Sequence, residues 1–195
     1  MPHSKKRHGM VLTEALVAIA TLAMGVMALG TITQNSISTT ILAKDYLVAR
    51  GLAKEGEEIV KNIRLTNRMQ QPTKPDCWLT PDVAAGCNAM TPNDYFVAYV
   101  KNGAWILEDK GSALPNPDLP KVSTNILFQL FSDDSGFYPQ PQSTKPAGAT
   151  GSKFYRSIKP TTITADSATF EIKVQWKDGA KTREMNRIVN MYNYF

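Results

Sequence analysis

The stretch that decides the fold is Met10–Leu29, MVLTEALVAIATLAMGVMAL, which has a single charged side chain, Glu14. At about 1.5 Å per residue, a helix of this length spans roughly the 30 Å hydrocarbon core of a bilayer. The residues before it, 1–9, are basic and contain no acid. A carboxylate inside such a span costs about 2.5–3.5 kcal/mol on insertion scales. The stretch therefore predicts a membrane-spanning helix whose glutamate has a dedicated partner.

This arrangement resembles the amino terminus of type IV prepilins and of the related pseudopilins of type II secretion systems, and within them it is most like a minor pilin. In that family a basic leader ends in glycine, the mature chain starts with an apolar residue, and the fifth mature residue is a glutamate. The corresponding positions here are Gly9, Met10 and Glu14, with Met10 in place of the commoner phenylalanine. The resemblance covers residues 3–30.

The resemblance implies a processing route and a set of partners. A prepilin peptidase would cut after Gly9, the freed amine of Met10 would be methylated, and that amine would pair with Glu14 of an adjoining subunit. The implied partners are the peptidase, the inner membrane, the pilus assembly platform and other pilin subunits, which are met through the N-terminal helix. Pairing of the two charges avoids the free-energy cost of an unpaired charge in apolar surroundings.

Two other interpretations of the same stretch remain open. A secretory signal peptide would have its apolar region at Val11–Leu29 and a cleavage site at Ala28-Leu29-Gly30. A plain single-pass anchor would keep its leader, with Glu14 as an interfacial residue near the end of the helix. The three interpretations differ in the amino terminus of the mature protein.

The net charge of +5 comes mostly from the leader, since Lys5, Lys6 and Arg7 supply three of the 22 basic residues. Without the leader, 19 basic residues face 17 acidic ones, a balance that argues against a nucleic-acid partner. Basic residues beside a first helix stay cytoplasmic, which predicts a single-pass membrane protein with an extracytoplasmic domain. The resemblance implies that this membrane is the inner membrane and that the protein later becomes part of a surface pilus. In that oxidising location Cys77 and Cys87 are a candidate disulfide, with two free thiols as the alternative.

The helical pattern continues beyond the membrane span. Its apolar residues follow an eleven-residue repeat and no proline interrupts it before Pro72, so the helix is predicted to run to around Asn67. We divide it into a membrane half at 10–30 and an amphipathic half at 31–69. The repeat consists of Ile37, Ile41, Val48, Leu52, Ile59 and Ile63. Two charged i,i+4 pairs on the other faces, Lys54 with Glu58 and Glu57 with Lys61, predict a solvated surface.

Residues 70–195 form the predicted globular domain, where the apolar period changes to 2, the period of strands. Asn102-Gly103 is a strong hairpin signal. The predicted strands are Tyr95–Lys101, Ala104–Glu108, Ile126–Phe131, Phe154–Pro160, Thr169–Lys177 and Lys181–Tyr194. The predicted loops are 70–94, 109–125 and 132–153. The pattern predicts an α+β fold in which the long N-terminal helix packs on an antiparallel sheet of about five strands, and the resemblance implies its pilin-like form.

Alternation along the last two strands predicts which side chains face the helix. The inward set is expected to be Phe170, Ile172, Val174 and Trp176, and the solvent-facing set Glu171, Lys173, Gln175 and Lys177. On the returning strand, Ile188, Tyr192 and Tyr194 are expected to continue the alternation.

The sequence indicates no enzyme. The only histidines, His3 and His8, fall in the leader, which removes Ser-His-Asp, Cys-His and His-ligated zinc chemistry from the mature chain. No Gly-rich phosphate loop opens a helix. We therefore predict no catalytic residues, no cofactor and no metal site; calcium at Asp133-Asp134-Ser135 is the alternative to a plain turn there.

The predicted function is that of a structural subunit, most like a minor pilin, of a type IV pilus or pilus-like filament assembled from the inner membrane. One alternative is a type II secretion pseudopilin. Another is a membrane-anchored extracellular adhesin or DNA-binding module whose function resides in residues 132–152. In that alternative, basic residues would hold phosphates beside aromatic residues that stack on bases: Lys145, Lys153 and Arg156 beside Phe137, Tyr138 and Tyr155.

Overall fold

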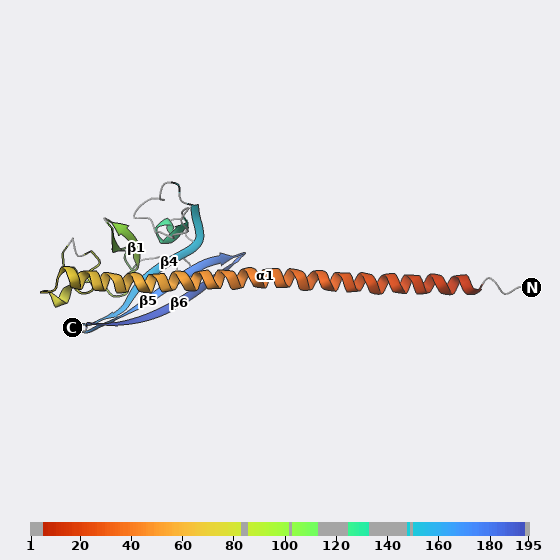
Figure 1. The fold of residues 1–195 in the computed structure, drawn as a ribbon, viewed down its shortest axis with the longest axis horizontal. Coiled ribbons are helices and arrows are strands. Elements are labelled where there is room, and N and C mark those ends of the chain that lie inside the picture. Colours follow the sequence, from red (N-terminus) through yellow and green to blue (C-terminus); the bar gives the residue numbers. More distant parts are fainter. Residues whose placement is uncertain are drawn as a thin grey trace, which may run out of the picture. The chain divides into compact units, whose positions relative to one another are not determined.

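The computed structural model describes residues 6–82, 86–101, 103–112, 125–132, 148 and 150–193. By its contacts the chain divides into two units, Met1–Asp45 and Tyr46–Phe195. One helix, α1 (Lys6–Gln70), belongs to both units (Figure 1). The units are described separately below.

In the first unit α1 carries the apolar stretch with its side chains exposed. Leu22 and Met27, for example, are 71% and 73% exposed. Several of its hydroxyl groups bond within the helix; for example, Thr21 donates to the carbonyl of Ala18 and Thr31 to that of Ala28. By length and composition α1 is a candidate membrane span, and no second helix among the described residues qualifies.

The bounds of α1 differ slightly from the predicted ones. The helix includes Lys6 to Gly9, which precede the predicted start at Met10. It ends at Gln70 rather than Asn67, two residues before Pro72, which disfavours helical backbone at the residue before it. The side chain of Asn67 is buried in the last turns and donates to the carbonyl of Thr80 over 2.8 Å, which holds the following loop against the helix.

The second unit contains a six-stranded antiparallel sheet and is therefore α+β. Each of the six predicted strand segments contributes a strand to this sheet, for which about five strands were expected. The path β2-β1-β4-β5-β6 is the order of pairing, and β3 pairs with β4 beside β1. The strands are β1 (Phe96–Lys101), β2 (Ala104–Asp109), β3 (Gln129–Ser132), β4 (Thr150–Ile163), β5 (Ser167–Asp178) and β6 (Lys181–Tyr192). Two 3-10 helices, η1 (Pro75–Cys77) and η4 (Asn125–Phe128), interrupt the connections.

The core lies between the C-terminal part of α1 and the sheet; in Figure 1 this part of the helix lies along β4, β5 and β6. The predicted inward face of β5 is confirmed, since Phe170, Ile172, Val174 and Trp176 are all fully buried. Trp176 packs edge-on against Tyr46 of α1, with ring centroids 4.9 Å apart. The helix contributes the outer part of its predicted stripe, Leu52, Ile59 and Ile63.

Other parts of the apolar pattern were placed wrongly. Ile37 and Ile41 are 57% and 53% exposed, because the core cluster draws on α1 only from Tyr46 onward. Ile188 and Tyr192 are 72% and 45% exposed. The register of β6 explains them: Phe170 pairs with Val189, so the odd-numbered residues of β6, among them the buried Val189 and Met191, share the helix-facing side of β5. Tyr194 lies outside the described residues.

Gln175 was expected to face water but is only 1% exposed. It lies in β5 between two paired strands, opposite Tyr155 of β4 and Glu184 of β6. Its side-chain amide donates to Glu184 over 3.4 Å. Cross-strand neighbours on both sides therefore cover it, which alternation along one strand does not predict.

The remaining strand predictions differ mainly in their bounds. The hairpin β1–β2 is confirmed, with Gly103 at φ 80° in its turn. The predicted strand Ile126–Phe131 is a 3-10 helix up to Phe128, and β3 starts only at Gln129. Strand β4 is longer than predicted at both ends and runs past Pro160, where the pairing with β5 shifts register. Such an irregularity accommodates the proline, which has no N–H for the ladder.

Cys77 and Cys87 are joined in a disulfide, with their Cα atoms 4.9 Å apart. The bond closes the loop that follows α1. Within this loop the carbonyl of Pro81 accepts a hydrogen bond from the backbone N–H of Leu107 in β2 over 3.2 Å. The loop therefore borders the edge of the sheet. Most of the predicted loops 109–125 and 132–153 fall outside the described residues.

Gly56 is a point of close approach between α1 and the sheet. A Cβ atom there would lie 2.8 Å from Cγ2 of Ile172 and 3.3 Å from Cδ of Arg156. We expect Gly56→Ala to lower the free energy of unfolding by about 1–3 kcal/mol through overpacking, although alanine is the better helix former. Urea denaturation of the detergent-solubilised chain measures this.

Gly51 is the matched control for that substitution, one and a half turns earlier on the same helix. A Cβ atom at Gly51 meets nothing within 4 Å. Gly51→Ala should therefore raise the free energy of unfolding by up to about 1 kcal/mol. Equal effects of the two substitutions would contradict the proposed close contact.

Candidate functional site

The residues predicted to act in processing and assembly lie at the start of α1. Gly9, Met10 and Glu14 are all helical, and the Glu14 side chain is exposed. Glu14 is four positions after Met10, which places the two residues about 6 Å apart along the helix axis and on one face. Among the residues whose side chains the structure describes, no ion pair includes Glu14.

A buried cation connects the helix to the sheet. Arg156 of β4 is fully buried, and its Nη1 lies 3.3 Å from Oε2 of Glu55 and donates to the carbonyl of Leu52, also over 3.3 Å. Burial lowers the pKa of the Arg156 guanidinium, and the Glu55 carboxylate opposes that shift. The Gly56 backbone makes room for this side chain.

The position of Arg156 removes one residue from the set named for the DNA-binding alternative. A fully buried guanidinium is not available to a phosphate. Tyr155 packs beside the buried Val97 and Phe128, and burial raises the pKa of its hydroxyl. Lys153 is exposed, with its ammonium 5.7 Å from the centroid of the Phe154 ring. The other residues of that alternative, Phe137, Tyr138 and Lys145, lie outside the described residues.

A second ionic cluster lies between α1 and β6. Glu57 pairs with Lys61 over 2.7 Å and also with Arg187. Its side chain is only 12% exposed, so this part of the predicted solvated surface instead faces the sheet. The hydrogen bond from Lys61, aided by that from Arg187, holds the pKa of Glu57 below its usual value although burial raises it. The same pairing with Glu57 raises the pKa of Lys61.

This cluster predicts a pH dependence of stability. Because the pKa of Glu57 is lower in the folded chain, its contribution is present above the unfolded pKa of about 4.5 and is lost as the pH falls through the folded pKa. We expect Glu57→Gln to lower the free energy of unfolding by about 1–2 kcal/mol at pH 7. The difference from the original chain should shrink at pH 3, as measured by denaturant titration at both values.

Glu58 serves as the control, because it shares Lys61 at 3.5 Å but is 58% exposed. Glu58→Gln should change the free energy of unfolding by less than about 0.5 kcal/mol. A Glu57→Gln effect that persists unchanged at pH 3 would show that the ionised carboxylate is not responsible.

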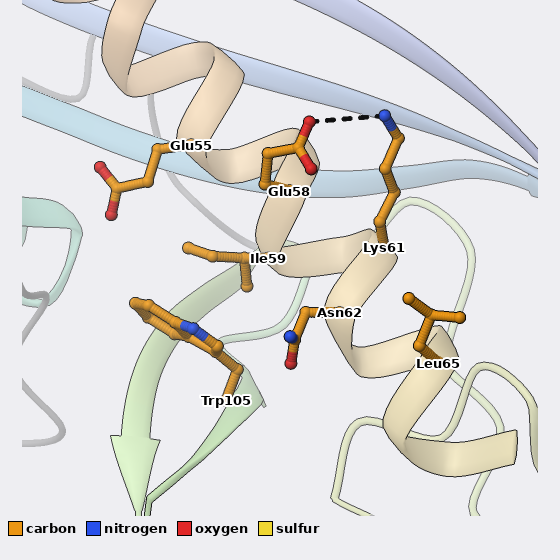
Figure 2. A pocket seen from close by; sticks show the side chains of 7 residues that line it. All are labelled: Glu55, Glu58, Ile59, Lys61, Asn62, Leu65 and Trp105. Carbon is orange, nitrogen blue, oxygen red and sulfur yellow. Dashed lines mark ion pairs between the residues drawn. The ribbon is translucent and has the colours of Figure 1, made fainter. Parts of the chain in front are cut away.

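A groove of about 350 Å³ lies between α1 and β2 (Figure 2). The helix supplies one wall and Trp105 of β2 the other, with the indole across from Ile59 and Asn62. Figure 2 also shows the Glu58 and Lys61 side chains paired at one rim. Seven residues line the groove: Glu55, Glu58, Ile59, Lys61, Asn62, Leu65 and Trp105. A smaller hollow of about 240 Å³ lies on the β6 side of the helix beside Arg64 and Tyr192.

Neither the groove nor the buried Arg156 was predicted from the sequence. A signal for the burial of Arg156 was present in the sequence, because Arg156 lies midway between the inward residues Phe154 and Ile158 and therefore on the same face of β4. The sequence contains no signal for the groove, because Trp105 and the helix come close together only in the folded chain. Among the described residues no group of three or more His, Cys, Asp or Glu side chains could hold a metal ion. Asp133-Asp134-Ser135 lie outside those residues.

In comparisons with known proteins, no family model matches the chain, and neither does any curated protein or solved structure. Fold and site together define an α+β domain on a long N-terminal helix that is apolar enough to cross a membrane.

Proposed function

We propose that this protein is a structural subunit, of the minor pilin kind, of a type IV pilus or pilus-like filament. It is held in the inner membrane by α1, cut after Gly9, methylated on Met10 and packed into the filament through the helix. The observation that carries the proposal is the lone acid of the apolar stretch, Glu14, five residues after the glycine that ends a basic leader.

The exposed apolar surface of the first unit supports this proposal. From Val11 to Leu29 the side chains of α1 are exposed throughout, and such a surface requires lipid or other helices around it. When a filament subunit assembles, its helix leaves the lipid and becomes surrounded by the helices of other subunits. In either one an unpaired Glu14 carboxylate is costly, so the methylated amine of a neighbour supplies the matching charge and sets the register of the two helices.

The decisive test is the mass of the mature amino terminus, measured on membranes and on sheared filaments. The proposal expects a chain that starts at a methylated Met10, and the full-length chain in cells without prepilin peptidase. A chain that starts at Thr31 would identify a secretory signal peptide instead. A full-length chain in wild-type cells would identify a plain anchor. Either result would end the proposal.

A pseudopilin of a type II secretion system has the same helix start, and we propose the pilus subunit over it on size. Removal of the leader leaves 186 of the 195 residues, with long connections around the sheet. Deletion of the gene distinguishes the two: loss or alteration of surface pili supports the minor pilin, and loss of protein secretion with normal pili supports the pseudopilin. The burial of Arg156 removes one of the basic residues on which a DNA-binding module would depend.

A further inference from the structure

The groove between α1 and β2 presents an aromatic wall and a polar wall to the same space. Trp105 lies opposite one face of the helix, on which Glu55, Ile59 and Asn62 follow each other at i,i+4 and i,i+7 spacing (Figure 2). All of these residues belong to the unit Tyr46–Phe195. The groove therefore lies entirely within one of the two units.

The charges of the groove are already neutralised within the chain. Glu55 pairs with Arg156 over 3.3 Å, and Glu58 pairs with Lys61 over 3.5 Å. Lys61 also pairs with Glu57 over 2.7 Å. A phosphate or a free amine would have to compete with these pairs for its counter-charge. The groove therefore favours a ligand without net charge.

The ligand must also be polar and yet have an apolar face. Most of the lining surface is apolar, but four of the seven lining side chains are charged or carry an amide. A purely hydrocarbon ligand would exclude water from these polar groups without replacing its hydrogen bonds. The indole of Trp105, with Ile59 and Leu65, offers flat and aliphatic surface for C–H groups. The Asn62 amide and the Glu58 carboxylate offer donors and acceptors for hydroxyl groups.

We propose that this groove binds a neutral carbohydrate, with one sugar ring stacked on Trp105 and its hydroxyl groups hydrogen-bonded to Asn62 and Glu58. Pyranose rings combine the two required properties, an apolar C–H face and a rim of hydroxyls. The volume of about 350 Å³ is at the lower end of the range typical of small-molecule sites, which suits one or two sugar rings.

The test uses the full chain in a detergent without a sugar head group. The probes are the methyl pyranosides of glucose, galactose, mannose and N-acetylglucosamine, titrated by saturation-transfer NMR and tryptophan fluorescence. The fluorescence change is expected from Trp105, because Trp78 and Trp176 are buried in the core. At least one probe should bind saturably with a Kd of about 1–10 mM, the usual scale for a single small ligand in an open site.

Two variants locate the binding. Trp105→Ala should weaken it at least about tenfold through loss of the stacking surface. Asn62→Ala should weaken it about fivefold through loss of a hydrogen bond. Trp105 also packs against the core, but Asn62 is exposed on a helix and alanine suits that position, so the second variant keeps the fold. Tyr192→Ala, an exposed aromatic residue outside the groove, is the control and should leave the Kd unchanged.

The proposal is overturned if none of the four pyranosides binds saturably, or if both groove variants bind as well as the original chain. It is also overturned if choline or inorganic phosphate binds the groove more tightly than every sugar, since the paired charges would then not exclude ions.

Discussion

We expect the Glu14→Leu variant to insert into the membrane as the original chain does and to be absent from filaments. Removal of a carboxylate from an apolar span lowers the cost of insertion by about 2.5–3.5 kcal/mol, so anchoring is not impaired. In the filament, however, the methylated amine of the neighbouring subunit would then be buried without a counter-charge, which costs about 3–5 kcal/mol. A penalty of that size reduces incorporation at least about a hundredfold.

Immunoblots of membrane and sheared-filament fractions measure both expectations at once. Glu14→Gln separates charge from size and should be excluded nearly as strongly as the leucine variant. Thr21→Val is the matched control, because Thr21 is exposed in the same span and its hydroxyl bonds only to the helix backbone. Normal incorporation of the Glu14→Gln chain would show that no charge pair sets the register.

The second large effect is expected at the buried ion pair of the globular unit. Glu55→Ala should lower the free energy of unfolding by about 3 kcal/mol, because it removes the carboxylate from a guanidinium that is fully buried. Urea denaturation of the solubilised chain, followed through the buried Trp176, gives the value.

A second substitution shows whether the unpaired guanidinium of Arg156 causes that loss of stability. Arg156→Met replaces the guanidinium with an apolar side chain of similar length, and a buried ion pair replaced in this way changes stability little. We expect Arg156→Met to lie within about 1 kcal/mol of the original chain, and the double variant Glu55→Ala, Arg156→Met to match it. If the double variant loses as much stability as the sum of the two single variants, the pair is not coupled and the explanation fails.

Local patterns in the sequence predicted the elements of this fold well. The uninterrupted apolar and amphipathic repeat predicted α1 to within a few residues at each end. Asn102-Gly103 predicted the β1–β2 hairpin, and alternation predicted the buried face of β5. These features depend on residues close together in the chain, for which period and turn chemistry are sufficient.

The candidate sites divide in the same way. Gly9, Met10 and Glu14 form a local motif, visible without any tertiary structure. The groove between α1 and β2 could not be predicted from the sequence, because Trp105 and Asn62 are brought together only when β2 packs beside the helix. The role of Gly56 likewise required the structure, since only the position of Ile172 shows that a side chain there has no room.

By itself the sequence determined that a long helix, apolar in its first half, is followed by a domain of antiparallel strands. It also determined that the apolar half holds a single acid, because composition and period along one segment decide both. The tertiary structure decided which faces are covered. Pairing register put Val189 and Met191 inside and Ile188 outside, packing of α1 on the sheet buried Arg156 and Glu57, and cross-strand neighbours covered Gln175. The residues that cover these three polar side chains lie far away in the chain, so the period of one segment does not identify them.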